Sequence, residues 1–279
     1  MKKFLSVILI LVLACSLFGC VSKNTLTEST TSKPETTTDS LTVTVTFPEG
    51  YTALEIAEKL EENKVCSVSD FMKAAQSEEL AKEYGFLSGM KDTENRAFLL
   101  EGYIFPDTYE FYKGESAKSA IARFLNNAQN KLTDEMSARA KELGYSIDEI
   151  ITLASVIQAE AGDKKEMGKV SSVLHNRIES PDYGKLQCDV TINYVNENIL
   201  VSPYVEGYKA GYTEYYNTYK RSGLPVGAIC NPGLDAINAA LYPEDTDYFY
   251  FVTDKDWNYY YASTYEEHLK NCKKCGIEF

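Results

Sequence analysis

Histidine is scarce in this chain of 279 residues, and the scarcity bears on metal chemistry. The two histidines are His175 and His268. A metal-dependent hydrolase would have to combine them with Asp189 and Cys188, yet the sequence holds no HExxH or comparable ligand spacing. We therefore expect no metal site and no cofactor, and we interpret His175 as a packed core or solvent-exposed residue.

Basic residues are few relative to acidic ones. The sequence has 28 Lys and Arg against 41 Asp and Glu, a net charge of −13. Loss of Lys2 and Lys3 with a signal peptide would leave 26 basic residues and a net charge of −15. This balance argues against nucleic acid as a partner and against docking on anionic lipid through a basic patch. It gives no information about a neutral glycan.

Cysteines are too few and too irregular to predict a disulfide scaffold. Besides Cys15 and Cys20, five occur, an odd number: Cys66, Cys188, Cys230, Cys272 and Cys275. The Cys272-Lys-Lys-Cys275 spacing occurs in redox and zinc sites, but a second CxxC and a preceding strand-to-helix pattern are missing. Surface thiols or a small local disulfide is the simpler interpretation.

The N-terminus resembles a bacterial lipoprotein signal. Lys2 and Lys3 precede a short apolar stretch that ends at Gly19-Cys20. We expect residues 1–19 to be removed and Cys20 to be lipidated, which would anchor the chain at the extracytoplasmic face of the cell membrane. Phe18 is unusual in such a signal and keeps an uncleaved transmembrane anchor as the alternative, although about 20 apolar residues are needed to span a bilayer.

The remaining sequence predicts an α+β fold behind a tether. Residues 20–40 are rich in Ser, Thr, Lys, Glu and Pro and should form a disordered tether. Residues 41–114 predict a small module: a strand at 41–50, helices after Thr52 and from about Ser69, and an aromatic strand at 99–112 that could pair with the first. A larger, mainly helical domain with some β-sheet should occupy residues 115–279. Its expected elements are helices at 116–131, 133–143, 146–160, 163–179 and 235–241, and a buried strand at 248–253.

The predicted helix at 146–160 is apolar almost to its end and then closes on an acid. Ser146 and Glu149 form a capping box, and Gly162 suits the C′ position. Glu160 would face the negative end of the helix dipole and be partly buried, and both effects raise a carboxyl pKa. Such a poised acid is a candidate general acid. Alternatively, Glu160 reaches solvent or pairs with Lys164 or Arg177.

Seven motifs in order resemble the endolytic murein transglycosylase family, also called MltG or YceG-like. They run from residue 41 nearly to the C-terminus: TFPEGYTALEIAEKL, LLEGYIFPDTYEF, LASVIQAEAGDKKEMGKVSSVLHNRI, LQCDVTINY, YNTY, GLPVGAICNPGLDAINAAL and TDYFYFVTD with STYEEH. The resemblance implies a LysM-like module at 41–114 and a catalytic lytic transglycosylase domain at 115–279. Such an enzyme cleaves the MurNAc-GlcNAc bond within nascent peptidoglycan strands and leaves 1,6-anhydroMurNAc ends. Its implied partners are glycan strands, the cell membrane through a lipid anchor, and cell-wall synthases.

The resemblance also assigns residues. The family's catalytic glutamate falls on Glu160, whereas many relatives carry a second Glu where this chain has Gln158. We expect Glu101 to make a structural hydrogen bond between module and domain, and we note Tyr259 where relatives often have histidine. The predicted substrate-binding residues are Asp189, Thr191, Asn217, Thr218, Tyr219, Asn231 and His268.

A non-catalytic peptidoglycan-binding lipoprotein is the competing hypothesis. In it the LysM-like module would bind the wall and the larger domain would be a scaffold. A pure binding protein has no need of a poised acid, so the buried helix that ends at Glu160 favours the enzyme.

Overall fold

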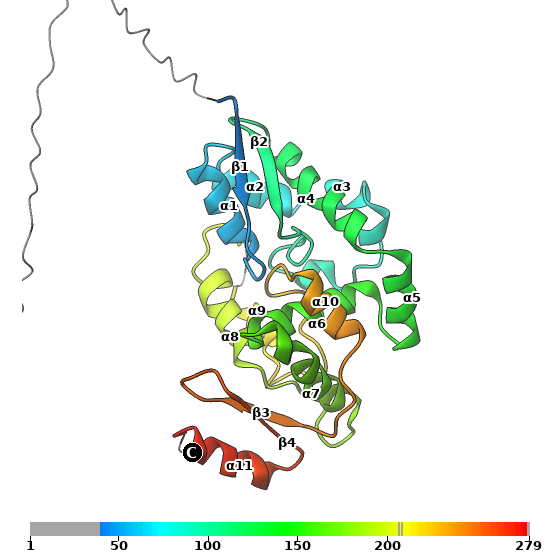
Figure 1. The fold of residues 1–279 in the computed structure, drawn as a ribbon. Helices are drawn as coiled ribbons and strands as arrows, with labels where there is room; N and C mark the ends of the chain where they lie inside the picture. Colours follow the sequence, from blue (N-terminus) through cyan, green and yellow to red (C-terminus); the bar gives the residue numbers. More distant parts are fainter. Residues whose placement is uncertain (1–39, 206, 208, 278–279) are drawn as a thin grey trace, which may run out of the picture. The chain divides into compact units, whose positions relative to one another are not determined.

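The structure, a computed structural model, describes residues 40–205, 207 and 209–277 (Figure 1). The predicted signal peptide, the lipidation site Cys20 and all but the last residue of the tether lie outside the described residues. Within the described ranges, no helix has the length and apolar character needed to cross a membrane. The described part is mixed helix and strand, which confirms the α+β class.

Helices dominate, and the strands form two short antiparallel pairs. The strands are β1 (Thr42–Thr46) with β2 (Thr108–Tyr112), and β3 (Tyr250–Thr253) with β4 (Tyr259–Ala262). The α-helices are α1 (Ala53–Glu62), α2 (Val68–Ala75), α3 (Glu78–Lys82), α4 (Ala117–Lys131), α5 (Asp134–Glu142), α6 (Ile147–Glu160), α7 (Met167–Glu179), α8 (Asp189–Tyr194), α9 (Tyr212–Tyr216), α10 (Leu234–Leu241) and α11 (Tyr265–Lys274). Short 3₁₀ or π turns occupy Gly85–Leu87, Thr93–Asn95, Lys164–Glu166, Val195–Ile199 and Lys209–Gly211.

The two strands and the two helices predicted for the N-terminal region are present, but a third helix that was not predicted, α3, follows α2, and the second strand is shorter than expected. The Thr52–Glu55 capping box starts α1 as expected. Residues 99–107 were predicted as strand, which is wrong. The N–H groups of Gly102 and Ile104 donate to the Asn231 side chain, each at 2.9 Å, instead of to a neighbouring strand. Gly102 also has φ +93°, a conformation that favours glycine.

Helix α6 lies at the centre of the described part. It packs against α5, α7, α8 and α10, and its residues from Ile150 to Ile157 are buried. The capping box of Ser146 and Glu149 is present as predicted. A single cluster of buried apolar side chains, from Val45 to Leu241, includes residues on both sides of position 114. The domain boundary at residue 114 therefore stays a prediction.

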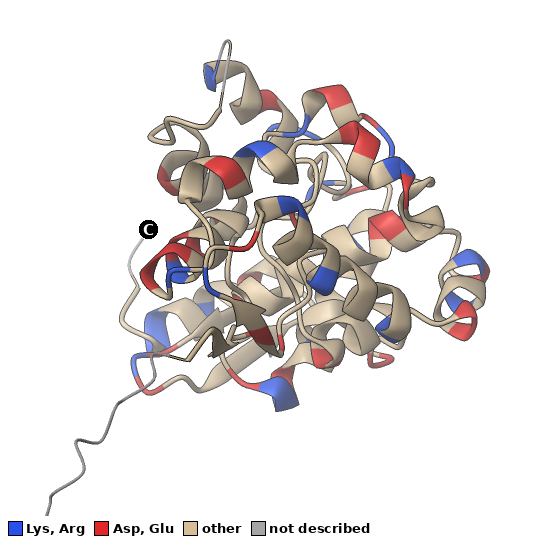
Figure 2. Cartoon of the chain, turned by 90° about the horizontal axis from the view of Figure 1, so that it is seen from above, with Lys and Arg blue, Asp and Glu red and all other residues tan. Residues whose placement is uncertain are grey.

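Strands β3 and β4 are less buried than the sequence suggested. The strand predicted at 248–253 begins at Tyr250, and all four residues of β3 are only half-buried. A sheet of two strands needs other elements to bury it, and the helices that pack most against this pair are α11 and α7. In Figure 1 the pair and α11 lie at the opposite end of the described part from β1 and β2. Figure 2 shows acidic and basic residues interspersed over the described helices.

Glu101 is a buried structural tie, as interpreted from the sequence. Its Oε1 accepts from the Ala53 N–H at 2.9 Å and from Asn231 Nδ2 at 2.8 Å, and its Oε2 accepts from the Tyr194 hydroxyl at 3.1 Å. These contacts join the start of α1, α8 and the loop before α10. Burial raises the pKa of Glu101 to about 8, so it is largely protonated at neutral pH.

His175 is a core residue, which confirms one of the two interpretations given above. Its side chain is buried, and Nε2 lies 2.9 Å from the Ala240 carbonyl oxygen. Burial lowers the pKa of His175, so the ring is neutral and can donate to that carbonyl.

Candidate functional site

A cavity of about 590 Å³ lies at the C-terminal end of α6. Its walls come from α6, α7, the segment leading into α8, β3 and α11. Four of the predicted site residues line it together: Glu160, Asp189, Tyr219 and His268. They are spread over more than 100 positions of the sequence, and the fold brings them to the same cavity.

Glu160 is the last residue of α6 and is half-buried in this wall. Burial raises its pKa to about 7, as the sequence predicted. The negative charge of Asp189 raises the pKa further, whereas a hydrogen bond from the Cys188 thiol and the charge of Arg177 lower it. At neutral pH Glu160 is therefore close to equally protonated and ionised.

The alternative of an ion pair at Glu160 does not describe this site. Lys164 pairs with Glu49 at 3.4 Å and with Asp235. Arg177 donates through Nε to the Phe249 carbonyl oxygen at 2.6 Å and through a second nitrogen to that of Leu186. These side chains are engaged elsewhere, and the half-buried carboxyl faces the cavity.

The end of α6 is closed by a tyrosine and not by a left-handed glycine. Gly162 follows the C-cap residue Ala161 and so occupies C′ as predicted, but it does not adopt the positive φ that usually accompanies a glycine there. The Tyr259 hydroxyl binds the helix end instead. It accepts from the Gly162 N–H at 2.7 Å and donates to the Glu160 carbonyl oxygen at 3.1 Å. Tyr259 thus fixes the backbone of the candidate acid.

Asp189 and Tyr219 form a polar pair on the cavity wall. The Tyr219 hydroxyl donates to Asp189 Oδ1 at 2.7 Å, and both residues are exposed. A carboxylate and a hydroxyl in this position can bind the hydroxyl and amide groups of a ligand.

His268 lies in the wall formed by α11. Its ring stacks on Tyr250 with centroids 5.0 Å apart, and Cys272 Sγ lies 3.5 Å from Nε2. Burial, with the nearby charge of Arg177, lowers the pKa of His268. The ring is therefore neutral at pH 7 and presents one donor and one acceptor nitrogen.

Three further predicted residues are buried behind the wall. The Thr218 hydroxyl accepts from the Cys188 N–H at 2.9 Å and lies 3.1 Å from the Thr191 hydroxyl. The Asn217 side-chain oxygen accepts from the Tyr219 N–H at 2.9 Å. These contacts hold Cys188 and Tyr219 in place. Direct substrate binding by the three buried residues stays a prediction.

Asn231, the remaining predicted site residue, is fully buried with Glu101. Its amide is occupied by contacts to four protein groups: the N–H groups of Gly102 and Ile104, the Tyr51 carbonyl and the Glu101 carboxyl. It fixes the loop before α10 from within the core.

Cys188 and Arg177 both lower the pKa of Glu160, a role that was not predicted for them from the sequence. Cys188 was considered only as a metal ligand and Arg177 only as an ion-pair partner. Burial raises the pKa of the Cys188 thiol well above its usual value, so it stays protonated and can donate to Glu160. The one available signal was the position of Cys188 next to Asp189 in the same motif.

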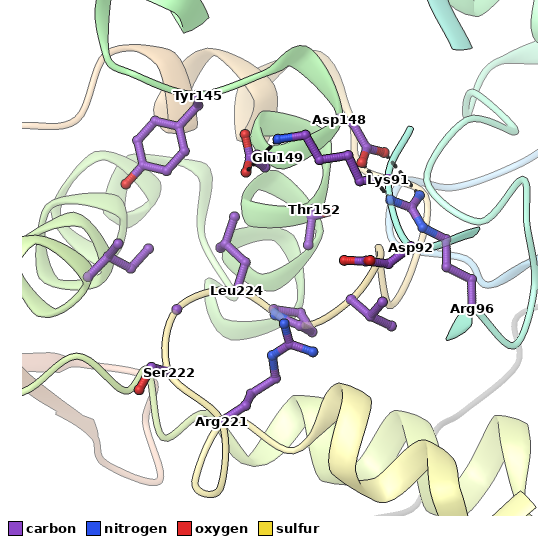
Figure 3. Close-up of a pocket in the computed structure, with 14 residues that line it drawn as sticks. Lys91, Asp92, Arg96, Tyr145, Asp148, Glu149, Thr152, Arg221, Ser222 and Leu224 are labelled. Atoms are coloured by element: carbon purple, nitrogen blue, oxygen red, sulfur yellow. Dashed lines mark hydrogen bonds and ion pairs between the residues drawn. The ribbon is translucent and has the colours of Figure 1, made fainter. Parts of the chain in front are cut away.

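A second cavity of about 250 Å³ lies beside the first turns of α6 (Figure 3). Charged side chains in it pair with one another: Arg96 with Asp148, and Lys91 with Glu149 at 3.8 Å. The nearest lining residue on α6 is Thr152. At 1.5 Å per residue it is about 12 Å along the helix from Glu160, so this cavity is separate from the candidate site.

A family model described as the YceG-like family matches residues 21–274. The chain belongs to the YceG-like family. Among solved structures, a crystal structure of a YceG-like protein from Listeria monocytogenes is similar, with a TM-score of 0.68 and 28% sequence identity. That similarity covers 82% of this chain and 75% of the other.

Two curated relatives of this YceG-like chain carry the name endolytic murein transglycosylase. The protein from Bacillus subtilis (strain 168) is 31% identical over 179 residues, which are 63% of this chain and 48% of the relative. The protein from Streptococcus pneumoniae serotype 2 is 29% identical over 245 residues, 82% of this chain and 44% of the relative. The chain thus spans about half the length of these relatives.

Proposed function

We propose that this chain is a membrane-anchored endolytic lytic transglycosylase that cleaves the MurNAc-GlcNAc bond within nascent peptidoglycan strands. The observation that carries the proposal is a half-buried carboxyl, Glu160, whose pKa is raised to about 7 at the wall of a large cavity. The names of the two curated relatives support the same reaction.

The proposed reaction needs one carboxyl that acts twice. Protonated Glu160 gives its proton to the glycosidic oxygen as the bond from that oxygen to C1 of MurNAc breaks. The resulting carboxylate accepts the proton of the MurNAc C6 hydroxyl as O6 bonds to C1. The 1,6-anhydro ring forms, Glu160 is again protonated, and no water is consumed. A pKa near ambient pH serves both steps.

The second acid of the cavity has a different task in this mechanism. Ordinary glycosidases need two carboxyl groups because water must be activated or a covalent intermediate formed. The C6 hydroxyl replaces both here, which leaves Asp189 and Tyr219 to bind sugar hydroxyl or N-acetyl groups. His268 offers a neutral donor and acceptor from the opposite element, α11.

The identity of the products tests this function. Purified full-length protein in detergent should release fragments from isolated peptidoglycan that carry 1,6-anhydroMurNAc ends, seen by mass spectrometry as a loss of one water relative to a reducing end. Digestion in H₂¹⁸O should leave the new ends unlabelled, because water is not the nucleophile. New reducing ends labelled with ¹⁸O would instead show that the enzyme is a hydrolase.

We also propose that residues 41–114 form a LysM-like module that positions the glycan and that Cys20 carries the lipid anchor. The pairing of β1 with β2, with α1 and α2 between them in sequence, supports the module, although α3 is additional to the expected order. The short apolar stretch before Gly19-Cys20 supports the anchor. An enzyme held at the outer face of the cell membrane would meet newly made strands, which makes cell-wall synthases the proposed partners.

The anchor is tested by replacing the lipidation site. Cys20→Ala should give an unprocessed precursor without diacylglycerol, whereas wild type should begin at a modified Cys20 in mass spectra of the membrane fraction. A wild-type chain that retains residues 1–19 and carries no lipid would identify the uncleaved transmembrane anchor instead.

A further inference from the structure

The chain's one tryptophan, Trp257, lies exposed beside the candidate acid. It is 72% exposed in the turn between β3 and β4. Its ring packs on Gly162, where an added Cβ would lie 3.1 Å from a ring carbon. Gly162 follows Glu160 by two residues, so their Cα atoms are within about 7 Å. A large aromatic surface is therefore open to solvent next to the end of α6.

Hydrogen bonds hold the turn that carries this ring. The Trp257 N–H donates to the Asp254 carbonyl oxygen at 3.0 Å, and Asp254 Oδ1 accepts from the Asp256 N–H at 2.9 Å and the Asn258 N–H at 3.0 Å. Tyr259, two residues on, joins the hairpin to α6 through Gly162 and the Glu160 carbonyl. The turn that carries the indole is thus held in place relative to Glu160.

Neither the core nor the backbone explains a tryptophan at this position. Its φ is +61°, in the left-handed region where a non-glycine residue is strained and glycine is not. Most of its surface packs against nothing in the described part of the chain. An exposed aromatic kept in a strained conformation beside a candidate acid indicates a function in binding.

We propose that Trp257 is a sugar-binding platform for the glycan strand. The apolar C–H face of a pyranose ring packs on the indole, and this ring neighbours the glycosidic bond that Glu160 cleaves. This inference rests on the proposed function, which supplies the glycan. An indole gives a large rigid surface for such packing with few rotatable bonds. A lipid surface is a poorer ligand, because one exposed ring in a turn that also carries Asp254, Lys255 and Asp256 offers little apolar surface to insert into a bilayer.

The single tryptophan makes the test direct, because emission excited at the indole reports on Trp257 alone. The probe is a stem-free oligosaccharide of alternating N-acetylglucosamine and N-acetylmuramic acid, titrated into full-length Glu160→Gln protein so that it is not cleaved. Emission should shift to shorter wavelength and saturate. Calorimetry should show about tenfold weaker binding when Trp257→Gly is added, since one aromatic contact is lost. Trp257→Tyr should recover part of the affinity.

Controls separate binding from folding and from the reaction. Trp257→Gly relieves the strained φ and should not lower the melting temperature. In otherwise wild-type protein it should raise KM with little change in kcat. Tyr242, just after α10, is another exposed aromatic residue, with 57% of its surface exposed. Tyr242→Ala should leave KM and kcat unchanged.

Two results would overturn the platform. One is unchanged emission together with equal affinity in Trp257→Gly; the other is an emission shift with phosphatidylcholine or phosphatidylglycerol vesicles and none with the oligosaccharide, which would assign the ring to lipid. If the wild type makes no anhydro ends but the emission still responds to glycan, the platform stands and the proposed reaction fails. If anhydro ends form and Trp257→Gly binds normally, only the platform is refuted.

Discussion

Replacing Glu160 by glutamine should lower the rate of glycan cleavage by about 10⁴-fold or more. General acid-base catalysis typically contributes about 10²- to 10⁴-fold to a rate, and the loss here should lie at or beyond the upper end of that range. The amide keeps the size of the side chain but cannot supply a proton to the leaving oxygen or accept one from the C6 hydroxyl. One residue performs both halves of the cycle, so both halves are lost. Anhydro product formed per minute from isolated peptidoglycan, measured by mass spectrometry, gives the ratio.

The fold and the binding of glycan should survive this change. Helix α6 is held by its capping box and by the buried residues before Glu160, which the substitution leaves intact. Glu179→Gln, a change at a mostly exposed acid on α7, is the matched control and should retain full activity. Near-normal turnover in folded Glu160→Gln protein would show that another group is the acid.

The same assignment sets the pH dependence of wild-type activity. Because burial raises the pKa of Glu160 to about 7, the acid form needed for the first step is lost as pH rises through that value. The upper limb of kcat/KM should therefore fall tenfold per pH unit above about pH 7. An activity that keeps rising to pH 9 would contradict a carboxylic acid in this role.

Replacing Asp148 by alanine should cost about 3–5 kcal/mol of the free energy of unfolding, because it leaves the Arg96 charge buried without its partner. The two side chains are only 3% and 6% exposed. Asp148 Oδ1 accepts from Arg96 at 3.0 Å and from the Tyr103 hydroxyl at 2.6 Å. Figure 3 shows the pair at the edge of the second cavity. A typical domain has a total stability of about 5–15 kcal/mol, so the loss would be a large share of it.

Urea unfolding followed by circular dichroism measures this loss. Glu78→Ala, which removes the exposed pair with Lys82 at 3.1 Å, is the control and should cost less than about 1 kcal/mol. Combining Asp148→Leu with Arg96→Met should recover much of the stability, since no charge is then left buried. A cost below 1 kcal/mol for Asp148→Ala would mean that water reaches Arg96.

The sequence predicted α6 and Glu160 well because their determinants are local. A capping box, a mostly apolar helix and an acid in the last turn are all contained in fifteen consecutive residues, and each appears in the structure. The first strand was also predicted from local sequence, and α1, α4 and α5 each begin one residue after a Ser or Thr N-cap: Thr52, Ser116 and Thr133.

Long-range contacts decided the features that the sequence could not predict. Residues 99–107 leave the strand conformation because Asn231, about 130 positions later, takes their N–H groups. Gly162 keeps a negative or extended φ because Tyr259, 97 positions later, closes the helix. The motifs also gave no means of separating Asp189 and Tyr219, which line the cavity, from Thr191 and Thr218, which support it from behind.

The hydroxyl of Tyr259 has a consequence for the order in which the protein becomes active. A chain is synthesised from its N-terminus, and β3, β4 and α11 are the last elements of the described part. Before they emerge, the Glu160 carbonyl lacks its donor and the cavity lacks the wall that carries His268. The carboxyl then lacks the part of its burial that these elements supply, and burial is the main cause of its raised pKa. In incomplete chains the pKa of Glu160 would therefore lie closer to that of an ordinary glutamate and would rise when the final hairpin docks.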